Sequence, residues 1–90
     1  MKESNGLVVY IVECSDKTLY CGWTNDLKKR LHEHNEGKNG AKYTRGRRPV
    51  KLLYQEPCLT RSDALKRERE IKGLTRLKKL RLIQGSLTAL

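Results

Sequence analysis

Glu68 is the residue of this sequence whose position most strongly suggests a chemical role. It lies in the run "ALKREREIK", four residues after Ala64 and three before Ile71, and helical spacing places its carboxylate within their apolar stripe. A carboxylate among apolar neighbours costs free energy unless it is paired or binds a cation. Either Glu68 forms a salt bridge with a nearby arginine, or it is a functional group. In the second case one carboxylate, with waters and a substrate phosphate, is a common way to hold Mg²⁺.

The run "LYCGWTNDLKKRLHEH" (19–34) contains a second group of candidates. Arg30 and His34 are four residues apart and share a helical face, whereas His32 points elsewhere. A cationic arginine beside a titratable histidine suits the stabilisation of a phosphorane and the handling of a proton. The alternative is a solvated charged face with a structural histidine.

Tyr10 and Tyr20 come from successive predicted strands and could project from the same face of a sheet. The alternative is that both are core residues whose hydroxyls are hydrogen-bonded. Gly22 follows directly and permits a close approach or an unusual backbone dihedral where the chain turns toward a helix.

Basic residues are concentrated in the run "KYTRGRRPVK" (42–51), where arginines and lysines alternate with a tyrosine. This composition suits phosphate contacts with possible base stacking. The predicted nucleic-acid contacts are Lys42, Tyr43, Arg45, Arg47 and Arg48. The basic run "RLKKLR" (76–81) either adds to this surface or is only the solvated face of a helix.

Strands and turns must position these residues. "LVVYIVE" (7–13) is rich in β-branched residues and predicts a buried strand, and "TLYCG" (18–22) predicts a second strand after the turn "CSDK". Together they predict a β-hairpin. "VKLLYQE" (50–56) predicts a third strand, and its apolar residues Val50, Leu52 and Tyr54 alternate toward one face.

Helices are predicted from capping residues and apolar periodicity. The segment 24–37 begins with residues that suit a cap, ends at Gly37, and has one face formed by Leu27, Leu31 and His34. The segment 37–49 predicts an exposed loop. A capping box from Thr60 to Asp63 starts a helix that stops at Gly73, and a last helix runs to Gly85 with Leu77, Leu80 and Ile83 at helical spacing.

The predicted order is therefore β-β-α-β-α-α, a small α/β (α+β) sandwich with one three-stranded sheet whose first two strands pair antiparallel. Ninety residues suit one domain, which we expect over residues 6–83, with a short tail at 84–90.

The formal charge of +10 and the pI of about 9.9 favour a polyanionic partner, and nucleic acid is the first candidate. No apolar run is long enough to cross a bilayer, so we expect a cytoplasmic protein without a membrane partner. Cys14, Cys21 and Cys58 form no C-x-x-C pair and are expected to be small core residues of a reducing compartment.

Taken together, these residues resemble the GIY-YIG endonuclease superfamily, most closely its small, single-domain bacterial branch, over about residues 6–83. The two signature triplets appear as "VVY" (8–10) and "YCG" (20–22). Arg30 falls ten residues after the second signature tyrosine, and His34 matches the frequent His or Tyr one turn later. Glu68 matches the family's glutamate, which follows an alanine by four residues and precedes an "IK" pair.

The resemblance implies a three-stranded antiparallel sheet flanked by helices, and phosphodiester hydrolysis in DNA assisted by one divalent ion, Mg²⁺ or Mn²⁺. It implies that Glu68 binds the metal, that Arg30 stabilises developing charge, that Tyr20 or His34 activates water, and that Tyr10 orients the site.

Two departures from the family pattern bear on substrate binding. Trp23 stands where several nucleases of the family have a lysine, and the sequence shows no second DNA-binding domain, which predicts low sequence specificity.

The leading hypothesis is therefore a metal-dependent endonuclease. The alternatives are a non-catalytic nucleic-acid-binding module and, third, an interaction adaptor that uses the leucines of the last helix. The oligomeric state stays open.

Overall fold

The computed structural model describes residues 6–37 and 42–88, without the side chains of 42, 43 and 86–88. The elements in chain order are β1 (Val8–Glu13), β2 (Leu19–Thr24), α1 (Leu27–Glu36), α2 (Lys42–Arg45), β3 (Lys51–Pro57), α3 (Arg61–Lys72) and α4 (Arg76–Thr88). The strands form a three-stranded antiparallel sheet of order β2-β1-β3. The predicted fold class and the order β-β-α-β-α-α are confirmed, with the short α2 as an addition.

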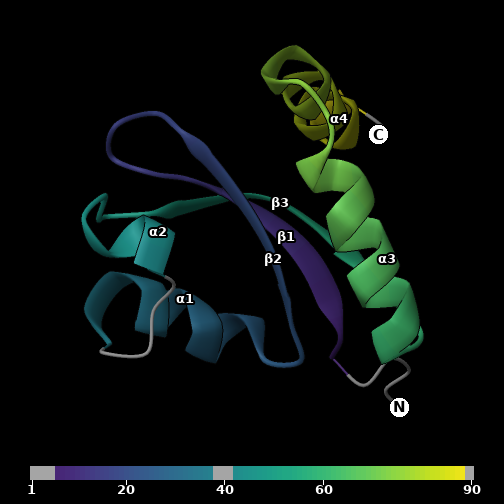
Figure 1. Ribbon diagram of the computed structural model, residues 1–90, viewed down its shortest axis with the longest axis horizontal. Coiled ribbons are helices and arrows are strands. Elements are labelled where there is room, and N and C mark those ends of the chain that lie inside the picture. Colours follow the sequence, from purple (N-terminus) through teal and green to yellow (C-terminus); the bar gives the residue numbers. More distant parts are fainter. Residues whose placement is uncertain (1–5, 38–41, 89–90) are drawn as a thin grey trace.

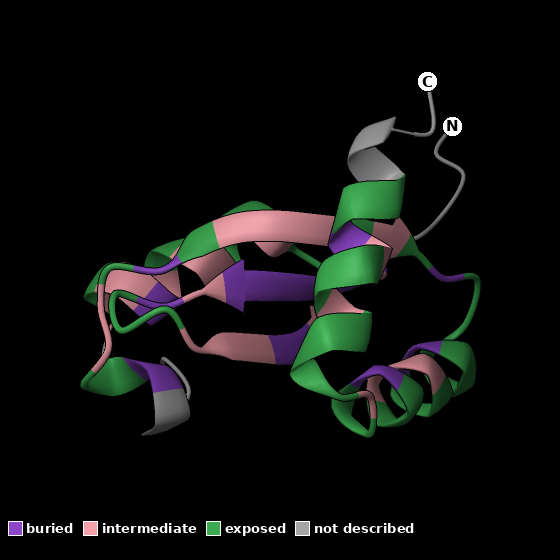
Figure 2. Cartoon of the chain, turned by 90° about the horizontal axis from the view of Figure 1, so that it is seen from above, coloured by how far each residue is buried: buried purple, intermediate pink, exposed green. Residues whose placement is uncertain are grey.

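The sheet lies between two layers of helices, with α1 and α2 on one side and α3 and α4 on the other (Figure 1). The central strand β1 is buried along most of its length, and its neighbours are mostly half-buried (Figure 2). This follows from the sequence of β1, because its run of β-branched residues gives both faces of the strand apolar side chains.

Each side of the sheet has its own hydrophobic cluster. The α3–α4 side is formed by Leu7, Val9, Ile11, Cys21, Cys58, Ala64, Ile71 and Ile83. The α1 side is smaller and contains Tyr10, Val12, Cys14 and Val50, with Tyr20, Leu27, Leu31 and Leu52 packed against them. All three cysteines are buried thiols.

The turn between β1 and β2 is held by Asp16. Its Oδ1 accepts hydrogen bonds from the backbone N–H (3.1 Å) and the hydroxyl (2.6 Å) of Thr18. Lys17 has φ 73°, a left-handed conformation that this tight turn requires. The result is the hairpin that the sequence predicts.

The pairing of β3 with β1 contains an irregularity that changes which face its residues use. Ile11 pairs with Tyr54, but the next residue, Val12, pairs with Leu52, so the register shifts by one residue. Val50 and Leu52 therefore pack on the α1 side, whereas Tyr54 packs on the opposite side. The prediction that Val50, Leu52 and Tyr54 share one face was wrong for Tyr54, because a bulge reverses the alternation.

Capping residues set the starts of the first and third helices as predicted. Asp26 accepts a hydrogen bond from the N–H of Lys29 (3.2 Å) at the start of α1, and Thr60 accepts one from Asp63 (3.0 Å) at the start of α3. The N–H of Gly37 closes α1 on the carbonyl of Glu33 (3.0 Å).

Two predicted segments differ from the structure. Part of the expected exposed loop 37–49 forms α2, and its Thr44 is fully buried; residues 38–41 lie outside the described part of the chain. The last helix was expected to end at Gly85 but continues to Thr88, through most of the predicted tail.

The apolar stripe predicted for α4 is only partly buried. Ile83 is in the core with Leu82 packed beside it, whereas Leu77 and Leu80 are exposed.

None of the helices in the described residues is both long enough and apolar enough to cross a membrane.

Candidate active site

Tyr10 and Tyr20 lie on the same face of the sheet, as predicted, and this is the α1 side. In the hairpin Tyr10 pairs with Gly22 and Val12 pairs with Tyr20, so the two tyrosines are diagonal neighbours on one face. Both rings meet the imidazole of His34 edge to face, with centroid distances of 5.9 Å from Tyr10 and 5.4 Å from Tyr20. The histidine thus joins the two signature tyrosines.

Gly22 leaves the space that the Tyr10 hydroxyl occupies. A Cβ at this position would lie 2.6 Å from the Tyr10 oxygen and 2.9 Å from its Cζ, well inside van der Waals contact. The sequence predicted a close approach here, and the structure shows that a tyrosine side chain makes it. Glycine at this position is therefore a condition for the placement of Tyr10.

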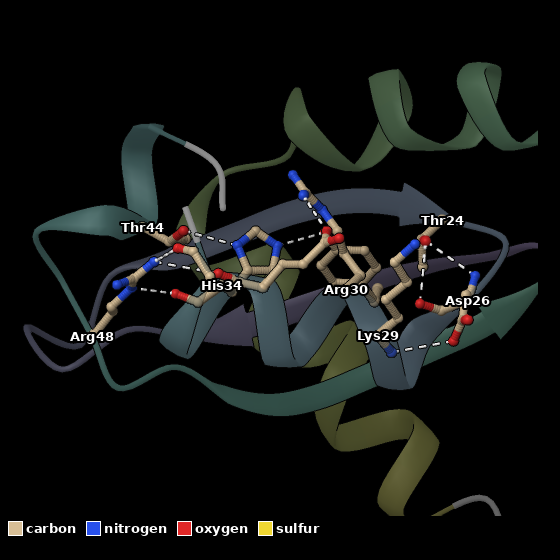
Figure 3. Close-up of polar contacts among 10 residues, drawn as sticks. Thr24, Asp26, Lys29, Arg30, His34, Thr44 and Arg48 are labelled. Carbon is tan, nitrogen blue, oxygen red and sulfur yellow. Dashed lines mark hydrogen bonds and ion pairs between the residues drawn. The ribbon is translucent and has the colours of Figure 1, made fainter. Parts of the chain in front are cut away.

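His34 has no exposed surface, and both of its ring nitrogens are hydrogen-bonded (Figure 3). Nε2 meets the Tyr10 hydroxyl at 2.8 Å, and Nδ1 meets the Thr44 hydroxyl at 2.8 Å. Burial, aided by the positive charges of Arg30 and Arg48, lowers the pKa of His34 to about 4. The ring is neutral at pH 7, so one nitrogen donates and the other accepts.

Arg30 lies beside this cluster at the edge of two open cavities. Its Nη1 pairs with Glu33 at 2.9 Å on the same helix. Burial raises the pKa of Tyr10 to about 12, because desolvation outweighs the hydrogen bond and charge that Arg30 supplies. A guanidinium that faces a neutral phenol and an open cavity can receive an anionic ligand from that cavity.

Glu68 lies on α3, on the other side of the sheet from α1. It is on the face of α3 that packs against β2. Its neighbours in the stripe, Ala64 and Ile71, are fully buried, and the Glu68 side chain is 19% exposed. Its Oε2 lies 3.2 Å from Lys72 Nζ, one turn further along α3. The predicted alternative of a salt bridge is thus present, with a lysine in place of an arginine.

Lys72 connects Glu68 to Tyr20. Its ammonium lies 5.8 Å from the centre of the Tyr20 ring. The continuous row from α3 to α1 is Glu68, Lys72, Tyr20, His34, Tyr10 and Arg30. The structure places Tyr10, Tyr20, Arg30 and His34 together on the α1 side of the sheet. Glu68 lies on α3, on the other side, and is linked to them through Lys72.

A metal ion at this site would have one protein carboxylate. Within residues 6–37 and 42–88, no group of three or more His, Cys, Asp or Glu side chains could hold a metal. Mg²⁺ is compatible with such a site, since it keeps several waters and often takes one or two carboxylates together with substrate phosphates. Glu68 could serve as the one protein ligand of such an ion. The described residues do not provide a site in which every ligand comes from the protein.

The arginines of the predicted nucleic-acid surface have different environments. Arg45 is exposed, and Arg47 pairs with Asp16 at 2.9 Å. Arg48 donates to three backbone carbonyls at the end of α1, those of His34 (2.5 Å), Glu33 (3.3 Å) and Gly37 (2.5 Å). The side chains of Lys42 and Tyr43 lie outside the described part. Arg47 and Arg48 thus have roles in the fold itself.

Sequence reasoning missed Thr44 and Lys72. Lys72 follows Glu68 by four residues, the spacing of a helical ion pair, and this signal could have identified it. Thr44 had no comparable signal, because it lies ten residues after His34 in a basic segment and meets it only in the folded chain.

Comparison with known proteins places these observations in a family. A family model described as the GIY-YIG catalytic domain matches residues 7–81. A UPF0213 protein of Syntrophus aciditrophicus is 60% identical over 76 residues, which cover 84% of this chain and 87% of that protein. A UPF0213 protein of Staphylococcus aureus is also 60% identical over 76 residues, with 84% and 92% covered.

Two solution NMR structures are similar to this one. The UPF0213 protein of Bacillus halodurans has a TM-score of 0.56 at 41% identity, over 91% of this chain and 84% of the other. A protein of E. faecalis has a TM-score of 0.61 at 37% identity, over 96% and 90%. The domain match indicates nuclease-type activity and interaction with nucleic acid at the level of the family. The chain belongs to the GIY-YIG family, and its relatives there are the small, single-domain UPF0213 proteins.

Proposed function

We propose that this protein is a divalent-metal-dependent endonuclease that hydrolyses phosphodiester bonds in DNA with little sequence preference. The observation that supports this most is the row of Tyr10, Tyr20, Arg30 and His34 on one face of the sheet, with Glu68 and Lys72 at its end. It combines a cation, two phenols and one part-buried carboxylate, the kinds of group that a phosphoryl-transfer site uses, and its Arg30 lines two open cavities.

Exposure separates the roles of the two proposed water-activating residues. Tyr20 is part-exposed and can hydrogen-bond an attacking water, whereas His34 has no exposed surface and both nitrogens are bonded. Tyr20 therefore positions the water, and His34 is a positioning residue that acts through Tyr10. Arg30 stabilises the negative charge that develops on the phosphoryl oxygens.

Glu68 is the residue that would hold Mg²⁺ or Mn²⁺, with waters and substrate phosphate oxygens as the other ligands. The ion would polarise the phosphate and neutralise part of its charge. Glu68 must then release Lys72. Since the Lys72 side chain is 51% exposed, moving its ammonium into water costs little, on the order of 1 kcal/mol or less.

The second candidate is a nucleic-acid-binding module without catalysis. The same ion pair favours it, because Lys72 already neutralises the carboxylate that would bind the metal. In that case the row of polar residues binds phosphate and nothing is hydrolysed.

A cleavage screen distinguishes the two candidates. Purified protein is incubated with duplex, single-stranded, flap and branched DNA in Mg²⁺, in Mn²⁺ and in EDTA. We expect metal-dependent cutting of at least one substrate, and a loss of about 100-fold or more in Glu68→Gln and in Arg30→Gln.

The matched control is Glu70→Gln. Glu70 lies on the same helix, is 58% exposed and pairs with Arg67 at 3.2 Å, so this variant should cut as well as the parent. Equal cutting by Glu68→Gln and the parent would reject the proposal. Salt-sensitive binding of every substrate with no cutting in either metal would favour the second candidate.

A further inference from the structure

The edge strand β2 carries an aromatic side chain that the proposed reaction does not use. Trp23 is the one tryptophan of the chain, directly follows Gly22 and is part-exposed. Its backbone partner on β1 is Val9, which is fully buried, so the indole extends from the α3 side of the sheet and packs partly against that core. Among the described strands β2 pairs with β1 alone, so it is an edge strand of the sheet.

The environment of the indole is cationic and open. The guanidinium carbon of Arg61, the first residue of α3, lies 5.5 Å from the centre of the Trp23 ring. Arg61 is exposed, and its side chain is long and flexible. The Trp23 ring therefore packs partly against the core and is also contacted by the cationic side chain of Arg61, which is able to move.

A groove of about 410 Å³ joins this tryptophan to the proposed site. Its lining residues are Trp23, Thr24, Asn25, Arg30 and Arg61. Arg30 is also the proposed charge stabiliser, so a nucleotide in this groove would lie next to the reacting phosphate. The volume is within the range of about 300–1,000 Å³ that is common for small-ligand sites.

Charge distinguishes this groove from the neighbouring cavity on the other side of Arg30. That cavity, of about 240 Å³, is lined by the acidic residues Asp26 and Glu33 as well as by the basic residues Lys29 and Arg30, so its formal charges balance. The groove beside Trp23 has two arginines and no acidic residue in its lining. A ligand with an anionic backbone and an aromatic group thus fits the groove better than the cavity.

We propose that Trp23 is the stacking platform for an unpaired nucleobase, with Arg30 and Arg61 on the flanking phosphates, so that the preferred substrate is single-stranded or locally unpaired DNA. This rests on the proposed function, whose substrate it specifies. A base within a duplex has both faces stacked on its neighbours, whereas an unpaired base can place one face on an aromatic ring.

Trp23 also provides the measurement. As the single tryptophan of the chain, it reports its own contacts by fluorescence, and EDTA in the buffer keeps binding separate from cleavage. The probes are a single-stranded oligonucleotide, the same sequence as a duplex, and an abasic strand with the same number of phosphates. We expect quenching by the single strand, little quenching by the others, and affinity about 5- to 100-fold weaker for the abasic strand.

Variants are measured by the fluorescence anisotropy of a labelled single strand. Trp23→Ala should bind about 5- to 100-fold more weakly, as the loss of one stacked base predicts, whereas Trp23→Phe should retain most of the affinity. Trp23→Lys should bind the normal and the abasic strand equally. Unfolding midpoints identify any variant that has lost its fold, and Trp23→Phe then carries the comparison.

Equal affinity of the parent for the normal and abasic strands, or no quenching, would overturn the stacking proposal. The two proposals fail in different ways. If Glu68→Gln abolishes cutting while a folded Trp23→Ala binds single strands like the parent, the nuclease stands and the platform is wrong. If single strands quench Trp23 but the parent cuts nothing, the platform stands and the nuclease is wrong.

Discussion

At the residue scale, Gly22 and Tyr10 depend on each other. We expect Gly22→Ala to displace the Tyr10 hydroxyl from His34, since the new Cβ would lie 2.6 Å from the Tyr10 hydroxyl oxygen. The loss of stability should be about 1–3 kcal/mol, the usual cost of overpacking, and is measured by urea unfolding. Gly46→Ala is the control, because no heavy atom lies within 4 Å of its Cβ. Equal losses in the two variants would contradict the packing argument.

His34 predicts how stability depends on pH. Folding lowers its pKa from an ordinary 6.5 to about 4, so between these values the unfolded chain holds a proton that the native chain lacks. The neutral His34 therefore makes its full contribution to the free energy of unfolding above pH 6.5. This contribution, at most about 3 kcal/mol, is lost as the pH falls toward 4.

The measurement is urea unfolding of the parent and of His34→Gln between pH 4.5 and 7.5. The stability of the parent should fall more steeply with acid than that of the variant, because glutamine does not titrate. His32→Gln, which changes an exposed histidine, should keep the parent's slope. Parallel curves for the parent and His34→Gln would show that burial does not hold this imidazole neutral.

At the scale of elements, Arg48 joins the segment before β3 to the end of α1. Its guanidinium donates to the carbonyls of His34, Glu33 and Gly37 at the C-terminal end of α1, where the last carbonyls of a helix lack enough backbone donors. The Glu33 carbonyl also accepts the N–H of Gly37. We expect Arg48→Lys to lose about 1–3 kcal/mol of stability, because an ammonium cannot reproduce the planar fork of a guanidinium.

Thermal or urea unfolding tests this expectation, and Arg45→Lys is the matched control because Arg45 is exposed. If Arg48→Lys weakened DNA binding but left the stability unchanged, this arginine would instead belong to the nucleic-acid surface.

At the scale of the whole molecule, the charge of +10 governs binding to DNA. A contact with a few phosphates releases counterions, so affinity should fall about ten- to a hundred-fold between 50 and 200 mM NaCl. Anisotropy with a labelled oligonucleotide in EDTA measures this. Affinity that does not change with salt would mean that neither the nuclease nor the binding module describes this protein.

Much of the fold could be predicted because its signals act over a few residues. Asp26 and Thr60 cap helices, Asp16 shapes the hairpin turn, and apolar alternation identifies the strands. Within the strands, the face on which Tyr54 lies was not predicted correctly. Its face depends on a bulge in the pairing with β1, and the sequence of β3 does not contain that information.

The candidate site divides in the same way. The sequence by itself determined that Arg30 and His34 share a helical face, because this follows from the helical period. It indicated that Tyr10 and Tyr20 could share a sheet face, and the register of the hairpin confirms that they do.

Only the tertiary structure decided that His34 is closed to solvent between Tyr10 and Thr44, that Arg48 caps α1, and that Trp23 meets Arg61 beside an open groove. Each of these contacts joins segments that are far apart in the chain. Burial and pKa depend on such contacts, and local sequence patterns do not specify them.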